Sequence, residues 1–109
     1  MSKRNAAALE VKDFDELKEP GNFEYAGLYG IDDDVPYGMI FVCPCGCGAH
    51  GALAFDNRPA DYLAKHPDAA RPAWHWDRNR EKPTLSPSIQ RTTGCRWHGY
   101  LRAGLFEEC

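Results

Sequence analysis

Five cysteines and a histidine are the residues of this chain whose types and spacing point most clearly to chemistry. Three of the cysteines lie in the run Cys43-Pro44-Cys45-Gly46-Cys47-Gly48, and a Cys-x-x-His pair follows at Cys95 and His98. Zinc is bound by thiolates and imidazoles that sharp backbone turns bring together, and glycines adjoin both clusters. The pattern therefore predicts a structural Zn²⁺ site formed by both clusters.

The spacing leaves the exact ligand set open. A four-coordinate ion that binds Cys95 and His98 needs only two thiolates from the first cluster. We favour Cys45 and Cys47, because a glycine follows each of them. The alternatives are Cys43 within the first cluster, His50 or Cys109 as reserve ligands, and a second ion bridged by thiolates.

The same residues argue for a structural rather than a catalytic ion. Catalytic zinc keeps an open coordination position beside a general base, whereas here the candidate thiolates outnumber four ligands and no Glu or Asp adjoins either cluster. A nucleophilic set could be assembled from Cys47, from His50 or His75, and from Asp77, but zinc-bound thiolates are poor nucleophiles. We therefore assign no catalytic residue and lean against an enzyme.

Length and composition indicate one small intracellular domain. The chain has 109 residues and a net charge of -3, and it contains no apolar run of about 18 residues that could span a membrane. Its five cysteines are an odd number, which fits metal ligation in a reducing compartment better than disulfides. We expect a cytoplasmic protein with an acidic N-terminal arm or short helix at 1–22 and a single zinc-stabilised domain at 23–109.

Alternating and compact apolar segments predict a mainly β fold, with a small α+β fold as the alternative. Short antiparallel hairpins would be stapled by the zinc-knuckle-like site, which lies at the tip of the hairpin formed by 37–42 and 51–55. Residues 56–72 read as a long loop with a helical fragment at 60–65. Two prolines confine 83–89 to a sheet edge or a loop. The other predicted strands are 23–29, 73–77, 97–101 and 105–106.

A second group of residues interleaves aromatic rings with cations. On a strand, Trp74 and Trp76 would share one face and could stack on bases or on a peptide, while the cations would contact phosphates. The simpler alternative is that the tryptophans fill the core and the arginines decorate a turn. The candidate nucleic-acid or partner-binding residues are Trp74, Trp76, Arg78, Arg80, Lys82 and Arg96.

Several motifs together resemble a known family. The order of Cys43-Pro44-Cys45-Gly46-Cys47-Gly48, Trp76-Asp77, Pro83-Thr84-Leu85-Ser86-Pro87-Ser88-Ile89 and Gly94-Cys95-Arg96-Trp97-His98-Gly99, with a final Cys109, is similar to the domain of unknown function 6527 family. These are small proteins of phages and bacteria, some of which lie near ubiquitin-like conjugation genes. The resemblance spans about 37–109 and implies a metal-bound, mostly β domain. Its motif positions are Cys43, Cys45, Cys47, Cys95, His98 and Cys109.

These observations support three hypotheses about function. The first is a zinc-binding protein-interaction module, encoded by a phage or mobile element, that binds and modulates a host protein in the host cytoplasm. The second is a nucleic-acid-binding zinc protein that uses the tryptophan and arginine segment. The third and least favoured is a metal-dependent hydrolase or a component of a ubiquitin-like pathway. None of the three involves a membrane.

Overall fold

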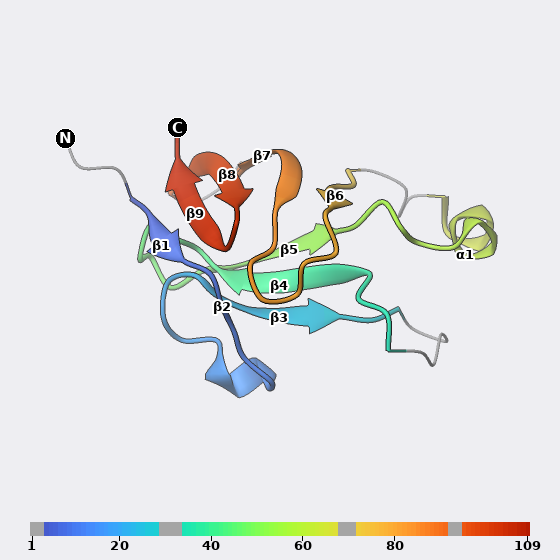
Figure 1. Cartoon of the computed structure of the whole chain (residues 1–109), viewed down its shortest axis with the longest axis horizontal. Helices are drawn as coiled ribbons and strands as arrows, with labels where there is room; N and C mark the ends of the chain where they lie inside the picture. Colours follow the sequence, from blue (N-terminus) through green and yellow to red (C-terminus); the bar gives the residue numbers. More distant parts are fainter. Residues whose placement is uncertain (1–3, 29–33, 68–71, 92–94) are drawn as a thin grey trace.

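The computed structural model describes residues 4–28, 34–67, 72–91 and 95–109 (Figure 1). Short strands dominate this part of the chain, and none of its helices is long and apolar enough to cross a membrane. The elements are β1 (Ala6–Ala7), β2 (Leu9–Glu10), the 3-10 helix η1 (Phe14–Glu16), β3 (Asn22–Ala26), β4 (Gly38–Val42), β5 (His50–Ala54), α1 (Ala60–Lys65), β6 (His75–Trp76), β7 (Leu85–Gln90), β8 (His98–Arg102) and β9 (Leu105–Glu108).

The strands form two sheets, which confirms the mainly β prediction. One sheet has the order β1-β9-β8-β7-β6 and the other has the order β2-β3-β4-β5. Neighbouring strands are antiparallel except β2 and β3, which are parallel. The expected hairpins β4–β5 and β8–β9 are both present.

The core lies between the two sheets and is built largely from aromatic rings. Phe41 of β4 stacks on Phe106 of β9 across the interface, with ring centroids 5.5 Å apart. Phe55, which follows β5, stacks on Trp76 of β6 at 5.1 Å. Alternation along each strand turns these side chains inward, and their burial is the main favourable term in holding one sheet against the other.

The turn between β8 and β9 follows directly from its sequence. Arg102 pairs with Leu105, which leaves Ala103 and Gly104 as a two-residue loop. Both loop residues have positive φ, at 46° and 77°, as a type I′ turn requires. This turn sets the register of β8, the strand that carries His98.

Strand β7 departs from expectation, because it lies inside its sheet between β8 and β6 rather than at an edge. Its register with β8 changes from Leu85 opposite Leu101 to Ile89 opposite Gly99, so β7 has two more residues than β8 over this interval. Pro87 falls within this irregular stretch, and Pro83 precedes the strand. Neither proline therefore interrupts the regular ladder, which is why β7 can lie in the interior.

The N-terminal segment is also more integrated than an arm or a helix would be. Strand β1 pairs with β9 in one sheet and β2 pairs with β3 in the other, so the chain passes from one sheet to the other within a few residues. The Trp97 indole N–H donates to the Arg4 carbonyl at 2.8 Å, and the Arg4 guanidinium pairs with Glu108. Backbone bonds to two sheet edges hold the described part of this segment, and η1 is the one helical turn described within it.

Close packing of β8 against β9 makes a specific demand at Gly99. A Cβ atom there would lie 2.1 Å from the Glu107 carbonyl oxygen and 2.6 Å from the Trp97 ring. We expect Gly99→Ala to lower the free energy of unfolding by about 3 kcal/mol, because backbone and a buried ring would have to move. Chemical denaturation measures this change.

Gly27 supplies the matched control, because a Cβ atom there has nothing within 4 Å. Gly27→Ala should change the free energy of unfolding by no more than about 0.5 kcal/mol. Equal stabilities for the two variants would contradict the tight β8–β9 packing described above.

Candidate metal centre and active site

Four cysteines from two distant parts of the chain meet at one end of the sandwich. Cys43 follows β4, Cys45 and Cys47 lie in the turn that leads to β5, and Cys95 precedes β8. The four Sγ atoms all lie within 4.8 Å of one another. Cys43 Sγ is 3.3 Å from Cys45 Sγ and 3.2 Å from Cys95 Sγ. The cluster therefore joins the sheet that contains β4 and β5 to the sheet that contains β8.

Local backbone geometry explains how three cysteines spaced two apart can converge. Gly46 and Gly48 have φ values of 90° and 83°, which L side chains rarely adopt. The Cys43 N–H donates to the Ala49 carbonyl at 2.8 Å and closes the turn. The Cys47 N–H donates to Cys45 Sγ at 3.3 Å, a bond that favours a thiolate at Cys45.

The thiols perturb one another strongly. Burial raises the pKa of the Cys43 thiol well above its usual range, and it also raises the pKa of Cys45. Burial acts in the same direction on Cys95, but hydrogen bonds with Cys45 and Cys43 outweigh it and lower the pKa of Cys95 to about 6. Hydrogen bonds from the Cys45 and Cys43 thiols thus stabilise a thiolate at Cys95, as a bound cation would.

The cluster fits a tetrahedral metal ion. Four thiolates at the usual Zn–S distance of about 2.3 Å have sulfur–sulfur separations of about 3.8 Å. The observed contacts of 3.2 and 3.3 Å and the 4.8 Å limit bracket that value. The four cysteines could therefore hold a metal ion with only small shifts, and they would complete a four-coordinate shell without a further ligand.

The structure places the other predicted ligands outside this group. His98 is not part of the group, and its Nε2 contacts Ser88 Oγ instead. His50 Nε2 lies 3.2 Å from the Leu17 carbonyl oxygen. Cys109 Sγ lies 3.3 Å from the His98 carbonyl oxygen. Among the predicted ligands, the structure thus brings together Cys43, Cys45, Cys47 and Cys95 only.

Ser88 and His98 form a second site on neighbouring strands. His98 Nε2 lies 3.0 Å from Ser88 Oγ, the contact expected of a serine nucleophile and its general base. His98 stands opposite Gln90, and Ser88 lies two residues before Gln90 in the irregular stretch of β7. Both residues are half-buried. The Trp74 indole N–H donates to the Ser88 carbonyl at 3.2 Å and ties this strand to the segment before β6.

A second histidine pair lies nearby but lacks a nucleophile. His75 Nδ1 lies 3.2 Å from Asp56 Oδ2, and His75 stands opposite Ser86 in the register of β6 and β7. Within the described residues, His75 makes no hydrogen bond to a serine, and its side chain is 69% exposed. No carboxylate of the described chain lies within salt-bridge distance of His98, so the Ser88 pair is a dyad.

Sequence reasoning did not single out Ser88, and it interpreted His98 as a metal ligand. The serine stands in no motif of nucleophilic serines, and only the Pro-Thr-Leu-Ser-Pro-Ser-Ile run drew attention to this segment. Because His98 follows Cys95 at zinc-ligand spacing, the metal interpretation took precedence. A strand pairing of 83–89 with 97–101 would have been the signal, since it brings this serine and this histidine to neighbouring strands.

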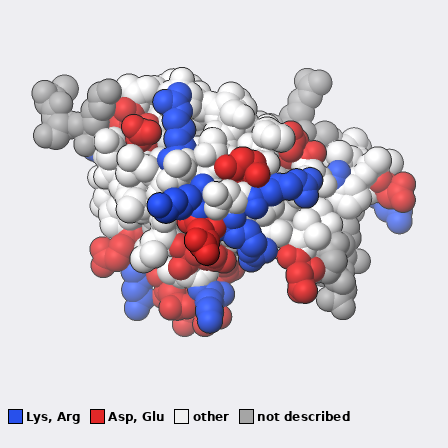
Figure 2. Space-filling view, in the orientation of Figure 1, with Lys and Arg blue, Asp and Glu red and all other residues white. Residues whose placement is uncertain are grey.

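The tryptophan and arginine residues do not form one binding face. Trp76 is only 6% exposed and lies in the core, so it cannot stack on a base. Arg80 lies over the Tyr25 ring at 5.0 Å and 3.8 Å from Glu10, and its side chain is 52% exposed. The residues Arg78, Lys82 and Arg96 are also exposed. On the face drawn in Figure 2, basic and acidic side chains are intermixed. That face does not present the uniformly basic surface that nucleic-acid binding favours.

The cluster predicts one tightly bound metal ion per chain. Cys95→Ser should remove the ion and lower the melting temperature by more than about 10 °C, because Cys95 is the one ligand supplied by the sheet that contains β8. Elemental analysis and thermal melting measure the two effects. Cys109→Ser is the matched control and should retain both the metal and the melting temperature. Full metal content in Cys95→Ser would contradict the assignment.

Comparison with known proteins assigns this chain to a family. The model of the family described as "Bacterial ubiquitination-like system serine protease (BubE)" matches residues 11–109. No curated protein and no solved structure matches the chain. The match corrects the resemblance to the domain of unknown function 6527 family. It also includes residues 11–36, which lie outside that resemblance.

The match also overturns the favoured function. A protease family replaces the expected protein-interaction module, and nothing favours the nucleic-acid alternative over it. The least favoured hypothesis, a hydrolase or ubiquitin-like pathway component, is the one that agrees with the family, although a serine protease does not depend on metal for its chemistry. Because the family model covers nearly all of the chain, this protein belongs to the BubE family of bacterial ubiquitination-like system serine proteases.

Proposed function

We propose that this chain is a serine protease in which Ser88 is the nucleophile and His98 is the general base. The observation that carries the proposal is the 3.0 Å contact between Ser88 Oγ and His98 Nε2. It is the only serine–histidine hydrogen bond found in the described parts of the chain, and it occurs in a member of a family described as serine proteases.

The chemistry follows from this pair. Ser88 Oγ attacks the scissile carbonyl carbon while its proton moves to His98 Nε2, and the resulting imidazolium returns that proton to the leaving amine as the C–N bond breaks. Water, deprotonated by the same nitrogen, then hydrolyses the acyl–serine ester and regenerates the hydroxyl. Because no carboxylate of the described residues pairs with His98 to stabilise the imidazolium, we expect slower turnover than a triad would give.

We further propose that the ion held by the four cysteines is zinc and that its role is structural. An all-thiolate shell suits Zn²⁺, and four protein ligands leave no open position for water or substrate. The ion would link the β4–β5 turn to the residue that enters β8, three positions before His98. Its contribution to catalysis is thus to position the general base.

Ser88 should react with a fluorophosphonate, a probe that labels activated serines and requires no known substrate. We expect mass spectrometry to place the adduct on Ser88, and His98→Ala to slow labelling by at least about 100-fold because the hydroxyl loses its base. Ser86→Ala is the matched control and should label at the wild-type rate. An unlabelled wild-type protein, or an adduct on Ser86, would contradict the assignment.

Replacement of zinc by cadmium separates a structural from a catalytic ion. Cadmium also prefers four thiolates but is a poor substitute where a metal-bound water reacts. The cadmium protein should therefore label with the fluorophosphonate within about twofold of the zinc protein's rate, since no step of the proposed reaction occurs at the metal. A loss of labelling while the melting temperature is preserved would indicate a catalytic metal.

A further inference from the structure

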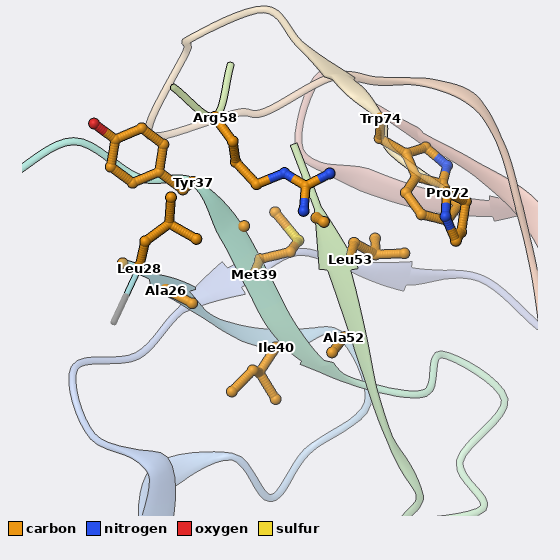
Figure 3. Close-up of a pocket in the computed structure, with 13 residues that line it drawn as sticks. Ala26, Leu28, Tyr37, Met39, Ile40, Ala52, Leu53, Arg58, Pro72 and Trp74 are labelled. Carbon is orange, nitrogen blue, oxygen red and sulfur yellow. The ribbon is translucent and has the colours of Figure 1, made fainter. Parts of the chain in front are cut away.

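A large cavity lies beside strands β4 and β5, away from the cysteines. It has a volume of about 480 Å³, and its walls are mainly apolar. Figure 3 shows the Arg58 side chain extending over these strands between Tyr37 and Trp74, with Met39 and Leu53 beneath it. Arg58 is the only charged residue that lines this cavity in the described chain. Cavities of this size with one convergent polar group are typical ligand sites.

Arg58 has no acidic partner among the described residues. The residue is only 8% exposed, and its Nε donates to the Phe55 carbonyl at 3.0 Å. No carboxylate of the described chain lies within salt-bridge distance of it. The planar fork of an arginine is suited to a carboxylate, and an anion bound in this mainly apolar cavity would pair with its charge. The cavity thus offers a site for a carboxylate ligand.

The cavity continues toward Ser88. A smaller cavity of about 160 Å³ lies between β5 and the end of β7, and Ile89 and Gln90 form part of its wall. The two cavities share Ala52, Leu53 and Trp74, so they adjoin along β5. Trp74 also contacts the Ser88 carbonyl through its indole N–H. A chain that occupied both cavities would therefore reach from Arg58 to the residues beside the nucleophile.

Strand β5 offers this chain a backbone partner. Hydrogen bonds from Phe55 to Tyr37 and from Cys43 to Ala49 show that odd-numbered residues of this hairpin bond across to β4. Ala52 therefore turns its N–H and C=O away from β4, toward the edge of the sheet. Further along, the Ala54 carbonyl already accepts from the Trp74 N–H at 2.8 Å. The open stretch at Ala52 lies between the two cavities and could pair with an extended peptide.

We propose that the Arg58 cavity is a substrate subsite that binds a carboxylate of the polypeptide to be cleaved, from an acidic side chain or from its C-terminus. The substrate extends along the edge of β5 between Arg58 and Ser88. This inference rests on the proposed protease function, and it adds a preference for substrates that present a carboxylate to Arg58.

Binding to the inactive Ser88→Ala variant tests the subsite without relying on cleavage. The probes are acetyl-Ala-Ala-Glu-Ala-Ala-amide, the same peptide with Gln in place of Glu, and acetyl-pentaalanine with a free C-terminal carboxylate. NMR titration follows the indole N–H of Trp74 and the Nε–H of Arg58. We expect the Glu peptide, the free-acid peptide or both to bind at least about tenfold more tightly than the Gln peptide. The two charged peptides distinguish a side-chain from a terminal carboxylate.

Substitution of Arg58 completes the test. Arg58→Gln in the Ser88→Ala background should abolish the preference for charged peptides, whereas the exposed control Arg102→Gln should retain it. Equal affinity of all three peptides for the Ser88→Ala variant overturns the subsite, and this comparison does not require Arg58→Gln to fold. If the charged peptides bind but fluorophosphonate leaves Ser88 unlabelled in the wild-type protein, the subsite stands and the protease assignment fails.

Discussion

The junction of four thiolates between the two sheets is the constraint on which the rest of this structure depends. Cys43, Cys45 and Cys47 belong to the hairpin of one sheet, and Cys95 leads into β8 of the other. A metal ion shared by these sulfurs would fix where β8 begins. His98 is the first residue of β8, so the proposed cross-link between the sheets would also position the imidazole against Ser88.

The proposed catalytic pair lies beside an irregularity in β7. Ser88 belongs to the stretch between Leu85 and Ile89 where the register with β8 changes, and its hydroxyl contacts the His98 ring. Bulged strands commonly reorient a side chain beside an active site. Trp74 connects the pair to the two cavities, because it contacts the Ser88 backbone and lines both of them. The proposed nucleophile, base and subsite thus all lie on or beside strands of the two sheets.

Local patterns in the sequence were sufficient for the hairpins and for the convergence of the cysteines. Alternation and glycine turns predicted the hairpins β4–β5 and β8–β9, and glycine-bracketed thiols predicted that Cys95 would meet the first cluster. Pairing between distant strands was not accessible in this way. The interior place of β7 depends on its register with β8, and the roles of Ser88 and His98 depend on that same cross-strand contact. The N-terminal strands form because two sheet edges accept them, a tertiary effect that local periodicity does not contain.

X-ray absorption at the zinc edge of the purified protein tests the central claim most directly, because it reports the atoms bound to the ion without reference to activity. The account predicts four sulfur atoms at about 2.3 Å and no nitrogen or oxygen neighbour. A nitrogen neighbour would mean that His98 or His50 binds the ion. A bound water would mean that the ion has a coordination position available for catalysis. Either result would contradict a closed thiolate centre that leaves His98 free to serve Ser88.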